Sequence, residues 1–303
     1  MPIVAYIDTI DVCHLECPTC PRGVRVMKNT SKKMPLELFE KIVAKVKSED
    51  YAQIGLYSWN EPFLNLTLHE YVSIVKRAGL ACEISSTLSL RRIAGLEKVL
   101  CAGLDHLTVS VSGADQATYE RNHVGGNLRY VLENLQRVRE IIDRNKLSTV
   151  ARVRMIRFSY NNEAEEPLRA IADDLGLNFE IIEGGGDPDQ KPSPILQLTP
   201  EWFDLENDRG SKRPLQESPS EVCSLLFDKL TIDCDGMVYL CCAFPNTESL
   251  KIGAYLNLGV DDLLMHRFRH PLCRVCSMPR RPIQDEDRSR LGKARQMSLV
   301  AAD

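Results

Sequence analysis

The sequence predicts an α/β fold: an open, partial (β/α)6 barrel of parallel strands, followed by a small domain made of a β-hairpin and a helix. Up to about residue 183, short apolar runs alternate with amphipathic stretches, which is the pattern of repeated strand–helix units. The 303 residues, 44% of them hydrophobic, are enough to bury one large core with an appendage. Asp235-Gly236, placed between two apolar runs, indicates the later hairpin.

Six apolar runs have the length of buried strands and are separated by helix or turn signals. They are Ile3–Ile10, Gln53–Tyr57, Ala81–Ser86, His106–Ser112, Val150–Phe158 and Asn178–Ile182. Leu36–Lys47 and Asn127–Asp143 between them have apolar residues at helical spacing. In parallel βα barrels the active site lies at the carboxyl ends of the strands, so we expect functional residues in the loops that follow them.

The barrel pattern stops near residue 183, and the rest of the chain divides into three parts. Residues 184–220 begin with three glycines and are polar and weakly periodic, which predicts a linker. Residues 221–280 hold a second group of cysteines, with hairpin strands at Leu225–Ile232 and Met237–Leu240 and a helix at Val260–Phe268. Residues 281–303 are predicted to form a charged tail.

Composition argues against nucleic acids and membranes as partners. The formal net charge is −4, so there is no overall basic field, and no apolar run approaches the ~20 residues that span a bilayer. The first residues lack the basic stretch and apolar core of a secretory signal. The chain has 11 cysteines, an odd number, and we expect a reducing, cytoplasmic compartment in which clustered cysteines indicate metal binding.

Three cysteines lie on one tight loop just after the first predicted strand. Cys13, Cys17 and Cys20 have the spacing Cys-x3-Cys-x2-Cys. Iron–sulfur clusters are normally held by four cysteine thiolates, so three would leave one iron open to bind a small molecule and pass it an electron. A zinc site formed with His14 is the alternative, although zinc sites usually pair two short knuckles across a longer gap.

This spacing after a first strand resembles the signature of the radical S-adenosylmethionine (SAM) enzymes. The resemblance implies a 4Fe-4S cluster on the three cysteines, with SAM bound to the open iron through its amino and carboxylate groups. It also implies reductive cleavage of SAM to methionine and a 5′-deoxyadenosyl radical, which takes a hydrogen atom from the substrate. An external reductant such as flavodoxin or ferredoxin would supply the electron.

The same resemblance predicts a SAM site from polar residues in the later loops and strands. Glu61-Pro62 stands where the family has a Gly-Gly-Glu-Pro turn, with Trp59-Asn60 in place of the glycines. Glu61 or neighbouring carbonyls would accept the ammonium of SAM. The predicted cofactor-binding residues are Glu61, Asn60, Ser85, Thr87, Ser110, Ser112, Arg152 and Arg154.

The two arginines of this set alternate with Val153 and Met155, so both should face one side of the fifth strand. If that side is the barrel interior, Arg152 or Arg154 would meet a carboxylate of SAM or of the substrate. The alternative is an exterior pair covered by the outer helices. Ser112 stands where relatives often have an aspartate, and no residue is assigned a catalytic role.

The second group of cysteines has the pattern Cys, Gly-x4-Cys, Cys-x2-Cys. It resembles the SPASM extension of radical SAM enzymes in its shorter, Twitch form, which implies a second, auxiliary 4Fe-4S cluster on Cys223, Cys241, Cys273 and Cys276. Cys234 or Cys242 could replace one of these ligands, and a zinc site with four cysteines is the alternative. Cys82 and Cys101 have apolar neighbours and are expected to be small core residues.

The expected function is modification, preferably oxidation, of a small polar metabolite in a biosynthetic pathway. The auxiliary cluster would transfer electrons or anchor the substrate. The first strand begins at once, so no amino-terminal peptide-docking domain is expected, which favours a metabolite over a peptide. The alternatives are a peptide or protein maturase, transfer of another SAM-derived fragment, and a non-catalytic iron–sulfur or zinc protein.

Overall fold

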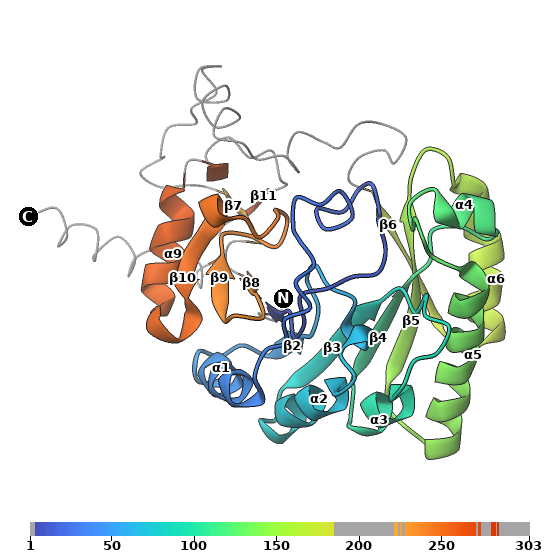
Figure 1. Cartoon of the computed structure of the whole chain (residues 1–303), viewed down its shortest axis with the longest axis horizontal. Helices are drawn as coiled ribbons and strands as arrows, with labels where there is room; N and C mark the ends of the chain where they lie inside the picture. The colour runs from blue at the N-terminus through green and yellow to red at the C-terminus, as the bar shows by residue number, and fades with distance from the viewer. Residues whose placement is uncertain are drawn as a thin grey trace, which may run out of the picture.

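The computed structural model describes residues 4–184, 221–223, 225, 228–270, 272–273, 280–282 and 284. Its first part is a curved sheet of parallel strands (Figure 1), so the α/β prediction is confirmed. The six predicted strands are all present: β1 (Val4–Ile7), β2 (Gln53–Gly55), β3 (Ala81–Ser86), β4 (His106–Ser110), β5 (Val150–Arg157) and β6 (Asn178–Glu183). They are neighbours in chain order, each parallel to the next.

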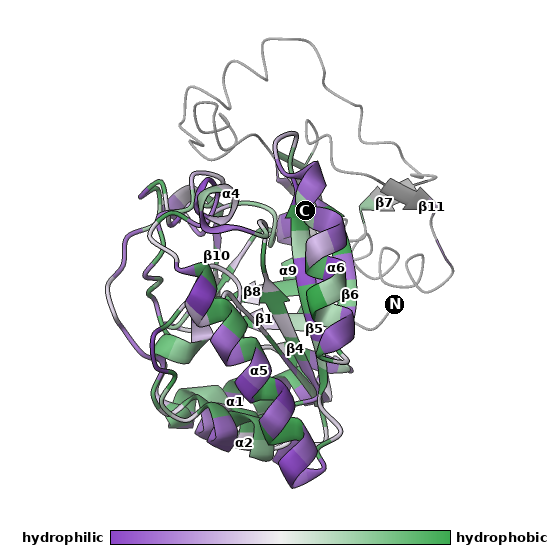
Figure 2. Cartoon of the chain, turned by 90° about the vertical axis from the view of Figure 1, so that its right-hand side faces the viewer, coloured by the Kyte–Doolittle hydropathy of each residue, from purple (hydrophilic) through white to green (hydrophobic). Residues whose placement is uncertain are grey.

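Helices cover the outer face of this sheet. They are α1 (Leu36–Ser48), α2 (Leu68–Arg77), α3 (Leu96–Cys101), α4 (Gln116–Glu120), α5 (Leu128–Asn145) and α6 (Glu165–Asp174), with short 3-10 turns η1 (Pro62–Leu64) and η2 (Asn162–Ala164). The two helices predicted by apolar spacing are α1 and α5, and both are confirmed within two residues. α5 begins where the Asn127 side chain accepts a hydrogen bond from the Tyr130 amide at 3.3 Å. Figure 2 shows hydrophobic and hydrophilic stripes along α5 and α6.

The carboxy-terminal hairpin continues the same sheet. β8 (Lys229–Ile232), β9 (Met237–Tyr239) and β10 (Lys251–Ala254) extend it beyond β1, as the orange ribbons of Figure 1 show. β8 pairs in parallel with β1, whereas β9 and β10 run antiparallel to their neighbours. The hairpin predicted at Asp235-Gly236 is therefore confirmed, but its first strand starts at Lys229 and not at Leu225.

The remaining elements surround this hairpin. They are η4 (Glu248–Leu250), η5 (Tyr255–Asn257) and α9 (Val260–Arg269), together with β7 (Glu221–Cys223), which pairs with β11 (Arg280–Pro282). α9 confirms the predicted helix. The division into barrel, linker, small domain and tail stays a prediction, because nearly all of residues 184–220 and 281–303 lies outside the described residues.

The two faces of the sheet differ in chemistry. Outward-facing residues such as Ile7, Ile84 and Val153 pack in one apolar core against the helices. Because side chains alternate along a strand, the residues between them face the concave inner side, and these are largely polar. They are Tyr6, Glu83, Ser85, Thr108, Ser110, Arg152, Arg154, Glu180, Lys229 and Thr231. The helices thus bury one face and leave a polar face inside the curve.

One predicted core residue is not in the core. Cys82 is fully buried on β3 as expected, but Cys101 is exposed. α3 is short and buries Leu96, Val99 and Leu100, so its last residue points to the solvent. Among the described residues, no helix is both long enough and apolar enough to cross a bilayer.

Candidate functional site

The cysteine loop follows β1 and is folded tightly. The Cys20 amide donates to the carbonyl of Cys17 at 3.1 Å, and a Cβ at Gly23 would lie only 2.2 Å from that same oxygen. Only glycine allows this approach. The Asn29 side chain closes the loop, because it accepts from the amide of Cys13 at 3.1 Å and donates to the Cys13 carbonyl at 2.9 Å. The three cysteines therefore lie on one tight loop after the carboxyl end of β1, and their role as cluster ligands stays a prediction.

The three cysteines are half-buried, and their thiols lie within electrostatic reach of one another. Burial raises the pKa of the Cys13 thiol to about 12, and burial also raises the pKa of Cys17, with further increases from the charges of Cys20 and Cys13. The pKa of Cys20 is raised by burial too. Ionisation of all three thiols costs free energy in this environment unless a cation binds the thiolates. The three donors therefore fit an iron–sulfur cluster.

Within the described part of the chain, no three Cys, His, Asp or Glu side chains converge on the position of one ion. A four-iron cluster makes no such demand, because each thiolate binds its own iron. The His14 Nε2 atom is 3.0 Å from the carbonyl of Ser89, so that ring nitrogen points to the loop after β3.

The loop after β2 is bonded to the segment that leads into the cysteines. Asn60 donates from its side chain to the carbonyl of Ile10 at 3.1 Å, and the Glu61 amide donates to the carbonyl of Val12 at 2.9 Å. Neither Trp59 nor Asn60 has a positive φ, so the glycines of the family turn are not required for this backbone path. The structure thus brings Asn60 and Glu61 next to the cysteine loop.

The Glu61 carboxylate is almost fully buried, with 1% of the residue exposed. Four donors surround it: the Ser86 hydroxyl at 2.6 Å, the Thr87 amide and hydroxyl at 3.0 Å each, and the Phe63 amide at 3.3 Å. Glu61 therefore joins the loops after β2 and β3. Its acceptance of the SAM ammonium stays a prediction, and so does a SAM contact by Thr87.

The other predicted cofactor residues lie apart from Glu61. Ser112 is fully buried and its hydroxyl is 3.1 Å from the His123 ring, which links it to the segment after α4. Arg152 and Arg154 face the interior, and each forms an ion pair with Glu180 on β6, at 3.4 and 3.3 Å. Of the two arrangements left open by the sequence, the interior one is therefore observed. Ser85 and Ser110 face the same side on β3 and β4.

Two residues of this site were missed from the sequence. Arg22, two residues after Cys20, and Asp8, at the end of β1, are both buried and both bind the backbone of Trp59. The signal in the sequence was weak: a charged residue directly beside a predicted metal loop or at the end of a predicted buried strand. Their partners come from distant parts of the chain, which single-sequence patterns do not give.

The sequence matches the profile of the radical SAM superfamily over residues 7–189, more than half of the 303 residues. The chain belongs to the radical SAM superfamily. Membership implies an enzyme that uses SAM radical chemistry, with a 4Fe-4S cluster and SAM as cofactors. No protein in the curated set that we compared matches this sequence.

Solved radical SAM structures share the fold of this chain. SuiB of Streptococcus suis bound to S-adenosylmethionine superposes with a TM-score of 0.64 at 15% identity, over 90% of this chain and 67% of SuiB. BtrN in complex with AdoMet and 2-DOIA gives a TM-score of 0.52 at 13% identity, over 91% of this chain and 93% of BtrN. At such identities the likeness concerns the fold alone.

The second group of cysteines in this radical SAM protein is spread from β7 to the segment after α9. The thiols of Cys241 and Cys242 form a hydrogen bond, which raises the pKa of Cys241 and lowers that of Cys242. Cys241 and Cys273 both pack against the small apolar cluster of Leu240, Phe244, Leu250 and Leu272. Cys223 is on β7, and Cys276 lies outside the described residues.

The two spare cysteines of the hairpin have different surroundings. Cys234 is buried in the main core at the hairpin turn, whereas Cys242 stands beside Cys241. The guanidinium of Arg267 and the ammonium of Lys229 favour the charged form of Cys242. Cys242 therefore lies next to one predicted auxiliary ligand, Cys241, whereas Cys234 lies in the main core. The auxiliary cluster itself stays a prediction.

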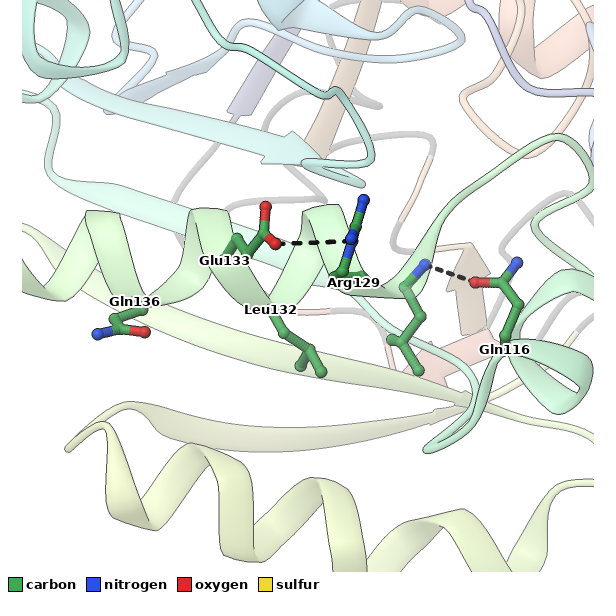
Figure 3. A pocket seen from close by; sticks show the side chains of 6 residues that line it. Gln116, Arg129, Leu132, Glu133 and Gln136 are labelled. Atoms are coloured by element: carbon green, nitrogen blue, oxygen red, sulfur yellow. Dashed lines mark hydrogen bonds and ion pairs between the residues drawn. The ribbon is translucent and has the colours of Figure 1, made fainter.

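A pocket of about 400 Å³ opens on α5, away from both groups of cysteines. Figure 3 shows its lining on α5 and the neighbouring α4, including Gln116, Leu132 and Gln136, and the ion pair between Arg129 and Glu133. It contains none of the predicted site residues, so we do not assign it to the SAM chemistry.

Proposed function

We propose that this radical SAM protein oxidises a small polar metabolite in a biosynthetic pathway. Cys13, Cys17 and Cys20 would hold the cluster, which when bound would supply the electron for reductive cleavage of SAM and so for removal of a hydrogen atom from the substrate. The loop of residues 58–61 receives the amino group of SAM beside the cysteine loop. The observation that supports a polar substrate is the polar inner face of the sheet.

That inner face is charged as well as polar. Tyr57 and Gln53 both donate to the Glu83 carboxylate, and Arg152 and Arg154 share the single carboxylate of Glu180. Thr108 and Thr231 face the same side, and their buried hydroxyls have no hydrogen-bond partner among the described residues. Buried polar groups are costly unless they are paired, so a substrate with hydroxyl or charged groups suits this face better than an apolar one.

A second 4Fe-4S cluster completes the proposal. Its proposed ligands are Cys223, Cys241, Cys273 and Cys276, and Cys242, which lies beside Cys241, could replace one of them. The cluster would accept the electron left after hydrogen removal or anchor the substrate. The first electron comes from an external reductant such as flavodoxin or ferredoxin in a cytoplasmic compartment, and neither nucleic acid nor membrane takes part.

The test is anaerobic reconstitution followed by SAM cleavage. Wild-type protein should take up about eight irons and release 5′-deoxyadenosine from SAM with dithionite. The Cys13→Ala/Cys17→Ala/Cys20→Ala variant should keep about half of the iron and lose SAM cleavage. Cys101→Ala is the matched control, because this thiol is exposed on α3 and should change neither quantity. Uptake of zinc without iron, or wild-type cleavage by the triple variant, would refute the proposal.

The second cluster is tested with Cys273→Ala/Cys276→Ala. This variant should lose about four irons, still cleave SAM slowly, and form no product from the true substrate. Full turnover by protein shown spectroscopically to lack the second cluster would rule out both of its proposed roles.

A peptide maturase is the second candidate function. The observation that favours it is the fold shared with SuiB, which has also been solved bound to the precursor peptide SuiA. The small-molecule and peptide fractions of a cell extract, separated by ultrafiltration, distinguish the two candidates. The fraction that accelerates 5′-deoxyadenosine release contains the substrate. If methylthioadenosine were the main product, another SAM fragment would be transferred instead.

A further inference from the structure

Arg22 is a buried guanidinium on the cysteine loop, with only 4% of the residue exposed. Its Nε donates to the carbonyl of Trp59 at 2.5 Å, and one terminal nitrogen donates to the carbonyl of Lys28 at 2.8 Å. The other terminal nitrogen forms an ion pair with Asp11. A planar guanidinium presents donors in fixed directions, so it can hold all three partners at once, which a lysine ammonium at the same place cannot.

Asp8 binds Trp59, one of the partners of Arg22, from the opposite side of its peptide unit. The Trp59 amide donates to the Asp8 carboxylate, at 3.3 Å from each oxygen. Burial raises the pKa of Asp8 to about 7, although the charge of Arg22 and the Trp59 amide act in the opposite direction. Trp59 is thus held at its N–H by the end of β1 and at its C=O by the cysteine loop.

We propose that Arg22 and Asp8 form a clamp that fixes Trp59, and with it the loop of residues 58–61, against the cysteine loop. Arg22 is the positioning residue of this clamp. Trp59 and Asn60 stand where the family has flexible glycines, and the clamp holds their backbone in place from outside. The inference rests on the proposed role of this loop in binding the amino group of SAM.

Two substitutions separate the geometry of the guanidinium from its charge. Arg22→Lys keeps the positive charge but loses the planar group with its fixed donors, whereas Arg22→Met loses both. Both variants should bind SAM about 10–100-fold more weakly, as expected for loss of an outer-shell partner. Arg25→Met is the matched control, because Arg25 lies on the same loop with 80% of its side chain exposed.

The measurements are iron content and SAM affinity from the change in the electron paramagnetic resonance signal. Wild-type SAM affinity in Arg22→Lys at wild-type iron content would overturn the positioning role. If Arg22→Met does not fold, Arg22→Lys alone decides on the clamp. SAM binding needs no substrate, so failure of the clamp is distinguishable from failure of the proposed oxidation.

Discussion

Glu61 is a buried carboxylate that joins two loops of the fold and that we propose also binds the cofactor. Its four donors come from the loops after β2 and β3, so its removal leaves the Ser86 and Thr87 hydroxyls and the Thr87 amide without their acceptor. We expect Glu61→Ala to lower the free energy of unfolding by about 1.5–3 kcal/mol and to weaken SAM binding. Denaturant titration and SAM affinity measure the two effects.

Glu61→Gln is the control, because it keeps the shape of the side chain and half of its acceptor capacity. It should be destabilised less than Glu61→Ala. If Glu61→Ala proved unstable yet bound SAM as tightly as wild type, the residue would serve the fold alone.

His123 is a buried imidazole, and burial stabilises its neutral form relative to its charged form. Burial lowers its pKa from 6.5 to about 4, and its ring stacks on Tyr119 with centroids 4.6 Å apart. The unfolded chain therefore binds more protons between these two pKa values, so stability is full above pH 6.5 and is lost as the pH falls towards 4. The loss amounts to about 3 kcal/mol over the whole window.

The measurement compares wild type with His123→Gln, which cannot titrate. Free energies of unfolding at about pH 5 and about pH 7.5 should differ more in wild type than in the variant. Equal differences in the two proteins would mean that His123 does not contribute to the pH dependence.

The sequence predicted the residues whose signal is local and missed those whose partners are distant. Cys13, Cys17 and Cys20 stand within eight residues, so their spacing was enough to predict a cluster site. Arg22 differs, because its role depends on the carbonyl of Trp59, 37 residues away. No pattern in one sequence shows that an arginine will be buried by a partner so far along the chain.

At the scale of elements, the turn at Gly236 fixes the hairpin that extends the sheet. Gly236 has a φ of +79°, which side chains with a Cβ rarely adopt. Gly236→Ala should lower the free energy of unfolding by about 1–2 kcal/mol, the cost of a left-handed residue. Gly253→Ala in β10 is the control, since its Cβ would meet Leu258 at an ordinary 3.7 Å. Thermal unfolding of both variants measures the difference, and equal effects would contradict a special role for the turn.

The end of the first strand differs from the prediction, because the chain stops pairing in the sheet there and begins to contact the loop after β2. The first strand was predicted to reach Ile10, but β1 ends at Ile7. Asp8, Ile10 and Val12 instead bind residues 59–61, so apolar character continues after the strand pairing has stopped. A hydrophobic pattern indicates that a segment is buried, but it does not indicate which other segment its backbone pairs with.

At the scale of the whole molecule, the hairpin belongs to the main core. Ile232 is fully buried in that core and pairs with Ile7 across the β1–β8 boundary. We expect Ile232→Ala to destabilise the whole described fold by about 2–5 kcal/mol. Leu256→Ala is the control, because this side chain is 37% exposed.

Urea unfolding followed at the barrel and at the hairpin should give one coincident transition for Ile232→Ala. Two separate transitions, with the barrel unaffected, would mean that the hairpin folds independently, as the sequence alone suggested. That expectation arose because the pairing of β8 with β1 joins segments more than 200 residues apart, which no local pattern can show.

The same pairing determines when the sheet can be completed during synthesis. β1 is made first, and its neighbour on one side, β8, emerges only after residue 229. At translation rates of about 5–20 residues per second, the edge of β1 that pairs with β8 stays unpaired for roughly 10–45 s. An unpaired edge can bind the wrong strand, and this risk for β1 lasts until β8 (Lys229–Ile232) has been translated.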